Sequence, residues 1–162
     1  MSREIRYNSH LPVLIKALSI TSGDVLEFGT GFFSTPVIHW MCLKRNILSY
    51  ESNEFFWKQN RQYHTDNHSI LWVKDWSQVT YNTADVALVD LAPAKERIRI
   101  ITELPNKVKL VIIHDTENEK EYNYNKIYPL FKYRFDFNIV IPHTTVLSDF
   151  VKLHDFMNIK EL

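Results

Sequence analysis

Five carboxylates follow one another along this chain, each within or directly after a short apolar run. Such runs are typical of parallel strands, because these are buried on both faces of a sheet. The carboxyl ends of parallel strands meet at one edge, which is where open α/β sheets bind their ligands. We therefore expect the five carboxylates to surround one binding site. They are Glu27, Glu51, Asp75, Asp90 and Asp115.

The first of these acids precedes a glycine turn. Residues 25–28 form a short apolar run, and Gly29 and Gly31 follow it. Glycine permits positive φ and a close approach of the backbone to a ligand. Thr35 is a good helix N-cap, and Pro36 suits the first helical position. The chain has 3 glycines, and two of them lie here, which favours a functional turn at the start of a helix, the local geometry that binds nucleotide-like ligands.

The spacing of the glycines narrows the choice of ligand. A dinucleotide-binding turn needs a third glycine where this chain has Ser34, and the G-x-x-x-x-G-K-[ST] phosphate loop is absent from the sequence. The pattern Glu27-x-Gly29-x-Gly31 instead resembles motif I, E/D-x-G-x-G-x-G, of class I methyltransferases that use S-adenosylmethionine (SAM). SAM carries a cationic sulfonium and an amino group, so a nearby carboxylate suits it electrostatically. The family's third glycine is Phe33 here.

The resemblance spans residues 23–150 and implies a fold. It implies a single Rossmann-like α/β domain over residues 1–162, doubly wound in three α/β/α layers, with a mostly parallel sheet and an antiparallel C-terminal hairpin strand. Residues 1–22, with a helix predicted over 11–20, are expected to lie over the cofactor. Other predicted helices cover residues 36–44, 54–63, 94–104 and 118–130. Predicted strands cover residues 25–28, 46–51, 70–73, 85–90, 108–113, 131–141 and 144–148.

The resemblance also implies which side chains bind SAM. Glu51 lies about 22 residues beyond Gly29, where nucleotide-binding βαβ units accept hydrogen bonds from ribose hydroxyls. Asp75 is expected to accept from the adenine amine, and Trp76 to stack on the ring. The expected SAM-binding residues are Glu27, Gly29, Thr30, Gly31, Ser34, Thr35, Glu51, Ser52, Asp75, Trp76 and Asp90.

Three residues at the ends of the fourth and fifth predicted strands are expected at the methyl side. They are Asp90, His114 and Asp115. Transfer from a sulfonium needs no acid for the leaving group, so the protein positions the acceptor and removes its proton. His114 suits that task near neutral pH. A hydrogen-bonded structural histidine at a strand end is the alternative interpretation.

Polar residues in the loops nearest this edge predict a small hydroxyl-bearing acceptor, such as a sugar or a phenol. Nucleic acid is not expected, because the Asn-Pro-Pro-Tyr motif of amino-methylating nucleic-acid enzymes is absent after the fourth strand and the net charge is +0. The expected substrate-binding residues are Tyr7, His10, Glu117, His143 and Thr144.

A resident metal ion is not expected. In small-molecule O-methyltransferases that use Mg²⁺, acids after the fourth and fifth strands bind the ion. Asp90 and Asp115 match that pattern, and Glu117 is a further candidate ligand. The asparagine that usually follows the second acid is Thr116 here, which counts against Mg²⁺. No His/Cys cluster has the spacing of a zinc site.

Composition limits the remaining possibilities. The 162 residues are 45% hydrophobic and 14% aromatic, which suits one packed domain. Balanced charge offers no field for nucleic acid or an anionic membrane, no apolar run is long enough to span a bilayer, and no signal peptide is recognised. The single Cys42 favours a reducing, cytoplasmic setting. Two alternatives stay open: a non-catalytic SAM-binding module or partner subunit, since Phe33 crowds the turn, and an α/β domain for another adenosine ligand.

Overall fold

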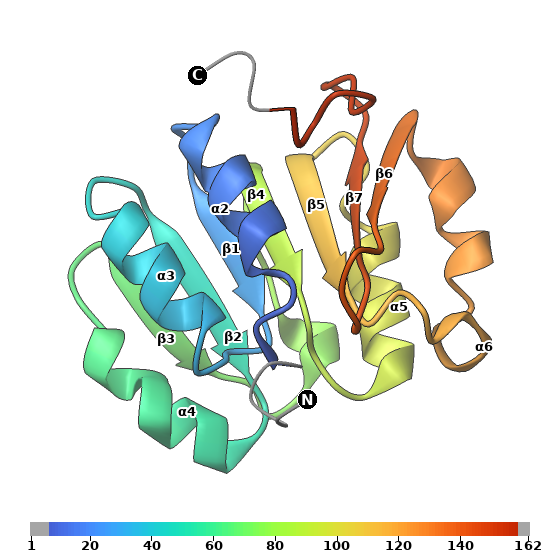
Figure 1. Ribbon diagram of the computed structural model, residues 1–162. Helices are drawn as coiled ribbons and strands as arrows, with labels where there is room; N and C mark the ends of the chain where they lie inside the picture. Colours follow the sequence, from blue (N-terminus) through green and yellow to red (C-terminus); the bar gives the residue numbers. More distant parts are fainter. Residues whose placement is uncertain (1–6, 159–162) are drawn as a thin grey trace.

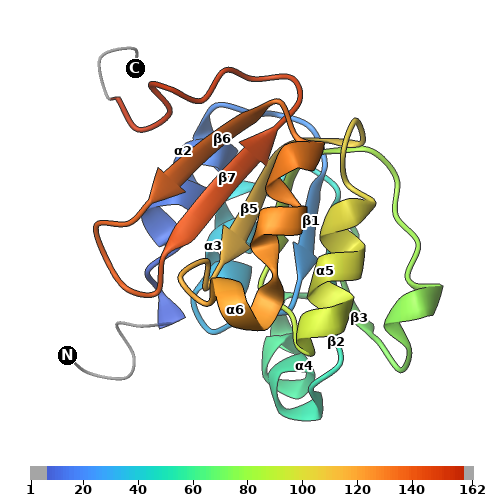
Figure 2. The same cartoon turned by 90° about the vertical axis from the view of Figure 1, so that its right-hand side faces the viewer.

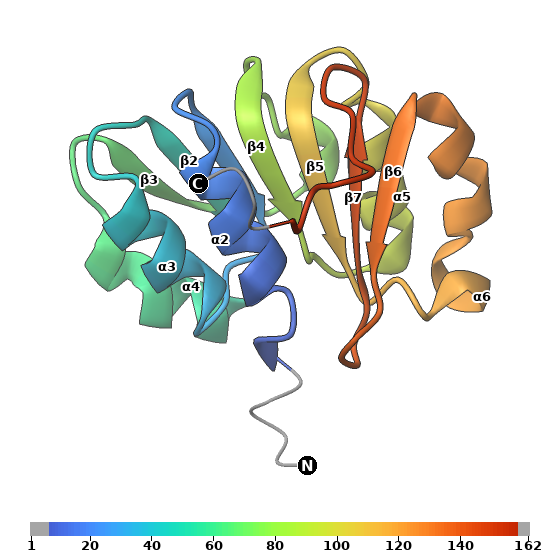
Figure 3. The same cartoon turned by 45° about the horizontal axis from the view of Figure 1, so that its top comes forward.

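A computed structural model describes residues 7–158, which are built around one seven-stranded sheet. The strand order is β3-β2-β1-β4-β5-β7-β6, and Figures 1 and 3 show β3 and β6 at opposite edges. The strands β1 to β5 are parallel, whereas β7 runs antiparallel between β5 and β6. Their bounds are β1 Val25–Phe28, β2 Ile47–Glu51, β3 His68–Trp72, β4 Ala84–Val89, β5 Val108–His114, β6 Tyr133–Phe137 and β7 Thr144–Ser148.

Helices cover both faces of this sheet. Figure 2 shows α5 and α6 in front of the sheet and α2 and α3 behind it. The α-helices are α2 Leu11–Ser19, α3 Ser34–Met41, α4 Glu54–Asn60, α5 Ala94–Thr102 and α6 Glu119–Tyr122. Short 3₁₀ helices lie at Arg61–Tyr63, Trp76–Gln78, Tyr124–Lys126 and Tyr128–Leu130. The doubly wound, mostly parallel sheet with an antiparallel C-terminal pair confirms the predicted fold class.

The central strands are apolar because both of their faces are covered. Every residue of β1 and β4 is buried. On one face, Ile100 and Ile101 of α5 belong to a core cluster with Leu26 and Phe28. On the other face, α2 contributes Leu14 to a second cluster. These two apolar layers hold the carboxyl ends of β1, β2, β4 and β5 in fixed positions.

The segment after β5 differs from the prediction of one helix over residues 118–130. The helix α6 ends after one turn because Asn123 adopts a left-handed conformation, with φ 52°. Two 3₁₀ helices follow, and Pro129 lies in the second of them, without an N–H to continue an α-helix. The strand β6 is also shorter than the predicted 131–141, since it ends at Phe137.

The helix α2 begins at Leu11, as predicted, whereas the start of α3 was predicted at the wrong residue. The helix α3 begins at Ser34, with Phe33 at its N-cap, so Thr35 is inside the helix and its hydroxyl is used elsewhere. Before α2, His10 is the N-cap residue and makes no capping hydrogen bond. Within residues 7–158, no helix is both long and apolar enough to cross a membrane.

Candidate active site

A cavity of about 560 Å³ opens where the order of the sheet reverses. The strands β1 and β4 are neighbours, but the helices that follow them, α3 and α5, cover opposite faces (Figures 1 and 2). Such a switch point leaves a crevice outside the carboxyl ends of the strands. The cavity is lined by Tyr7, His10, Gly29, Thr30, Gly31, Phe32, Ser34, Glu51, Asn53, Phe55, Phe56, Asp90, Leu91 and Ala92.

The glycine turn forms the floor of this cavity. Gly29 has φ 93°, a conformation that favours glycine. A Cβ atom on Gly29 would lie 2.5 Å from the carbonyl oxygen of Asp90, so the turn also needs glycine for its contact with the end of β4. The N–H of Asp90 donates to the carbonyl oxygen of Phe28 (2.8 Å). The backbone therefore fixes the glycine turn and Asp90 to each other.

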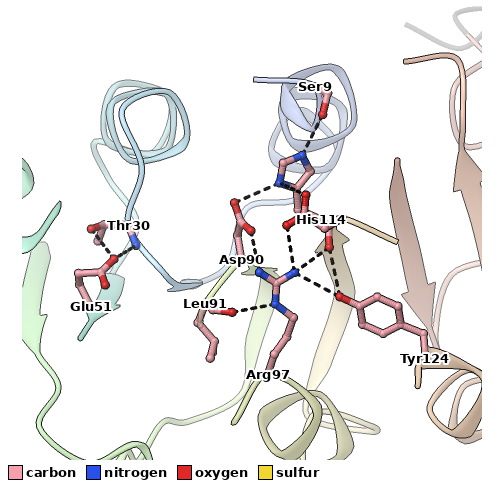
Figure 4. Close-up of polar contacts among 9 residues, drawn as sticks. Ser9, Thr30, Glu51, Asp90, Leu91, Arg97, His114 and Tyr124 are labelled. Atoms are coloured by element: carbon pink, nitrogen blue, oxygen red, sulfur yellow. Dashed lines mark hydrogen bonds and ion pairs between the residues drawn. The ribbon is translucent and has the colours of Figure 1, made fainter. Parts of the chain in front are cut away.

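Glu51 lies at the end of β2, with its carboxylate facing the glycine turn (Figure 4). The N–H and hydroxyl of Thr30 donate to its Oε2 atom at 2.7 and 3.0 Å, and the N–H of Asn53 donates to Oε1 at 2.6 Å. Burial raises the pKa of Glu51 above its ordinary value, against the effect of these donors. The backbone N–H of Ser52 acts on it as well, so these donors fix the Glu51 carboxylate at the cavity lining, where it can contact a ligand hydroxyl.

Asp90 and His114 form the polar wall opposite Glu51. The Nδ1 atom of His114 lies 3.1 Å from Oδ2 of Asp90, and its Nε2 atom lies 2.8 Å from the Ser9 hydroxyl (Figure 4). Burial acts to raise the pKa of Asp90, but the hydrogen bond and charge of His114 and the charge of Arg97 lower it to about 2. Burial acts to lower the pKa of His114, yet Asp90 and Asp115 raise it overall. The pair therefore favours a proton on His114 and a charged Asp90.

Arg97 is a buried residue that the sequence interpretation missed, and it holds this wall together. Its guanidinium donates to Oδ1 of Asp90 at 2.9 Å, to the carbonyl oxygen of His114 at 3.0 Å and to that of Leu91 at 2.8 Å (Figure 4). It also donates to the hydroxyl of Tyr124 and packs over the ring of Tyr122. Its position one turn into the helix that follows Asp90 could have indicated from the sequence that it lies near this acid.

His10 lies against the same wall and is 2% exposed. Its ring centroid is 4.8 Å from that of His114, in an edge-to-face arrangement. Neither ring nitrogen of His10 has a hydrogen-bond partner among the described residues. Burial, together with the charge of His114, lowers the pKa of His10 to about 4. His10 therefore presents a neutral imidazole at the cavity wall.

The structure brings together many of the predicted site residues and leaves others aside. Those that line the cavity are Tyr7, His10, Gly29, Thr30, Gly31, Ser34, Glu51 and Asp90. The others are Glu27, Thr35, Ser52, Asp75, Trp76, His114, Asp115, Glu117, His143 and Thr144, none of which lines it.

Glu27 lies beneath the turn rather than in the cavity, which corrects its predicted contact with SAM. It is 0% exposed and accepts hydrogen bonds from the hydroxyls of Thr35 and Ser49. The Thr35 hydroxyl in turn accepts from the N–H of Gly31. Burial raises the pKa of Glu27 to about 7 against the effect of these hydroxyls. Glu27 and Thr35 therefore support the turn from below.

Asp75 and Trp76 do not form the predicted adenine site. Asp75 caps the 3₁₀ helix that follows it, accepting from the N–H and hydroxyl of Ser77, and it lines a separate depression beside Thr80. Trp76 is 5% exposed in the core, and its indole N–H donates to the hydroxyl of Ser52 (3.1 Å). Its ring is therefore not available for stacking on a ligand in the cavity.

The remaining predicted residues follow β5 or lie at the start of β7. Asp115, with φ 60°, follows β5, and its Oδ1 atom is 3.6 Å from Nδ1 of His114. Glu117 accepts from the N–H of His143 at 2.7 Å, so these two hold one loop to another. Thr144 is buried beside His114 in the β5–β7 register, and its hydroxyl has no partner among the described residues.

Three phenylalanines on the cavity were missed as site residues. Phe55 and Phe56 were expected to be core residues, but both lie in edge-to-face contact with Phe32 across the cavity mouth. Phe32 and Phe55 are 51% and 56% exposed. Consecutive aromatic residues near the start of a short helix cannot all share its buried face. This pattern could have indicated from the sequence that some of them are exposed. Phe33, expected to crowd the turn, does not line the cavity.

Comparisons with known proteins agree on the fold. No protein-family model and no curated protein matches this sequence. The structure is similar to that of a presumed caffeoyl-CoA O-methyltransferase from Staphylococcus aureus, with a TM-score of 0.60 and 17% identity over 91% of this chain and 84% of that one. It is also similar to a methyltransferase from Pyrococcus furiosus, with a TM-score of 0.53 and 17% identity over 86% and 83% of the two chains.

A third similar structure holds a ligand. It is the plantazolicin methyltransferase in complex with SAH (S-adenosylhomocysteine), with a TM-score of 0.52 and 13% identity over 76% of this chain and 55% of that one. At such low identity these likenesses establish the fold alone. This chain therefore has the fold of class I methyltransferases.

Proposed function

We propose that this chain is a SAM-dependent methyltransferase that acts on a small hydroxyl-bearing acceptor. The observation that carries the proposal is the arrangement of the cavity. A positive-φ glycine turn and the Glu51 carboxylate lie on one side of it, and Asp90, backed by His114, lies on the other. The class I methyltransferase fold supports the same conclusion.

The lining of the cavity suits the chemical groups of SAM. Its volume of about 560 Å³ lies within the usual range for small-molecule sites, roughly 300–1,000 Å³. The rings of Phe32, Phe55 and Phe56 offer an apolar surface for a purine, and the Glu51 carboxylate lines the cavity where it could accept from ribose hydroxyls. When bound, SAM supplies the electrophilic methyl group.

The chain itself would position the acceptor and remove its proton. Asp90 lines the cavity, whereas His114 is buried behind it, so Asp90 is the group that would contact an acceptor hydroxyl. His114 and Arg97 lower the pKa of Asp90 and keep it charged, so Asp90 could take the proton that the acceptor oxygen loses as the methyl group is transferred. Arg97 keeps Asp90 in place throughout.

An acceptor screen tests this proposal. The chain is incubated with SAM and a panel of sugars and phenols, and the release of S-adenosylhomocysteine is measured. We expect turnover with at least one hydroxyl compound and a loss of about 100-fold or more in Asp90→Asn. A matched change at an exposed loop residue, Asp66→Asn, should leave the rate unchanged. Methylation of nucleic acid alone would contradict the proposed acceptor, and SAM binding without any turnover would favour a non-catalytic module.

A further inference from the structure

Three side chains with metal-binding atoms meet at the wall of the cavity. They are His10, Asp90 and His114, and one ligand atom of each lies within 4.8 Å of the others. We propose that these three residues bind a divalent transition-metal ion. Two imidazoles and one carboxylate form a donor set that suits ions such as Zn²⁺.

His10 is the observation that points to a ligand. Its imidazole is 2% exposed, yet both ring nitrogens lack a hydrogen-bond partner among the described residues. Burying a polar group without a partner is unfavourable, and an ion bound to one ring nitrogen would offset that cost.

The other two ligands are already oriented by their neighbours. The Ser9 hydroxyl lies 2.8 Å from Nε2 of His114, which leaves Nδ1 facing Asp90. Arg97 donates to Oδ1 of Asp90, which leaves Oδ2 facing His114. Metal-binding imidazoles and carboxylates usually have such second partners, which fix the ligand atoms toward the ion.

The charges around the cluster also favour a cation. The carboxylates of Asp90 and Asp115 flank His114, and the guanidinium of Arg97 is the cation that faces both. One negative charge is in excess when His114 is neutral. A divalent ion would offset this charge, and it would take the place of the proton between Nδ1 of His114 and Oδ2 of Asp90.

This cluster differs from the Mg²⁺ pattern considered from the sequence, which joined Asp90 to Asp115. Magnesium prefers oxygen ligands, whereas imidazoles favour transition metals. The spacing of zinc motifs could not reveal the site, because its ligands come from the residue before α2 and the ends of β4 and β5. The inference shares Asp90 and His114 with the proposed function, but metal binding is measured without SAM, so its failure would leave the proposed function standing.

Calorimetry of the chelator-treated full chain with Zn²⁺ tests the proposal. We expect one ion per chain, with affinity lowered more than about tenfold in His10→Ala. His64→Ala, a change at an exposed histidine outside the cluster, should leave the affinity unchanged. Mg²⁺ should not compete. Visible absorption of the Co²⁺-loaded chain gives a second readout, and its bands should disappear in His10→Ala.

Two results would overturn the proposal. One is the absence of Zn²⁺ binding by the wild-type chain, and the other is equal affinity in the wild type and His10→Ala. Circular dichroism establishes that each variant is folded, and His10→Gln, which keeps a polar side chain of similar length, replaces His10→Ala if the latter is unfolded. A Co²⁺ spectrum unaffected by His10→Gln would then contradict the assignment of His10 as a ligand.

Discussion

The Nδ1 atom of His114 lies 3.1 Å from the Oδ2 atom of Asp90, across the ends of the neighbouring parallel strands β5 and β4. The two residues are separated by 24 positions in sequence, and the sheet places them side by side. Because Asp90 lines the cavity and His114 is buried behind it, this contact holds the carboxylate that faces the cavity in its charged form. The same contact contributes two of the three proposed metal ligands.

Arg97 should be essential to this arrangement. Replacement of Arg97 by Met would leave the Asp90 carboxylate without its charged partner. Removal of one member of a buried pair costs about 3–5 kcal/mol, and because the Asp90 side chain is 28% exposed we expect a loss near the lower end of that range. We expect urea unfolding to show a loss of that order for Arg97→Met. Arg134→Lys, in an ion pair whose members are each 43% exposed, should cost less than about 1 kcal/mol. Equal losses for the two variants would contradict the role assigned to Arg97.

Glu27 should make stability depend on pH. Its folded pKa, about 7, lies above the ordinary value of 4.5, so the folded chain binds more protons than the unfolded chain between these values. Its contribution to the unfolding free energy is complete below pH 4.5. That contribution is lost as the pH rises through about 7. Relative to Glu27→Gln, the wild type should lose up to about 1.4 kcal/mol of unfolding free energy for each pH unit in this window.

Urea unfolding of both proteins across this pH range provides the measurement. The difference between wild type and variant isolates Glu27 from the other titrating groups. A difference that stays constant with pH, or one that moves in favour of the wild type as the pH rises, would show that Glu27 is not held in the neutral form.

Phe55 should contribute to ligand binding rather than to stability. It is 56% exposed at the cavity, so Phe55→Ala removes little buried area. Loss of an aromatic contact with a bound purine costs about 1–3 kcal/mol in comparable stacking sites. Calorimetry should therefore show at least about fivefold weaker binding of S-adenosylhomocysteine, with an unchanged thermal midpoint. Phe150→Ala, at an equally exposed residue outside the cavity, should change neither. A lower thermal midpoint with unchanged affinity would contradict this assignment.

The sequence predicted the fold class because the strands are short apolar runs followed by acids. In the predicted strand 85–90, the apolar residues 86–89 are buried at every position, as continuous hydrophobicity indicates. The region after β5 was harder to predict. Asn123 adopts a left-handed conformation that depends on its surroundings, and its type alone does not require one. The predicted 118–130 helix is broken at this residue.

The site was predicted best where the backbone determines it. Gly29 and Glu51 line the cavity because a turn and a strand end place them there. Hydrogen bonds between side chains were harder to predict from the sequence. Glu27 and Trp76 are residue types that suit a SAM site, but Glu27 accepts from Ser49 and the indole N–H of Trp76 donates to Ser52. Arg97 was missed because its role arises only when the ends of two strands and two loops come together.

Binding of the SAM product gives the most direct test of the account. Isothermal calorimetry with S-adenosylhomocysteine is compared for the wild type, Glu51→Gln and Glu54→Gln, the last of which makes the same chemical change at an exposed residue three positions away. We expect micromolar binding by the wild type and Glu54→Gln, and at least about tenfold weaker binding by Glu51→Gln, since hydrogen bonds to a charged group contribute about 1.5–3 kcal/mol. No binding by the wild type, or equal binding by all three proteins, would contradict the claim that this cavity holds SAM.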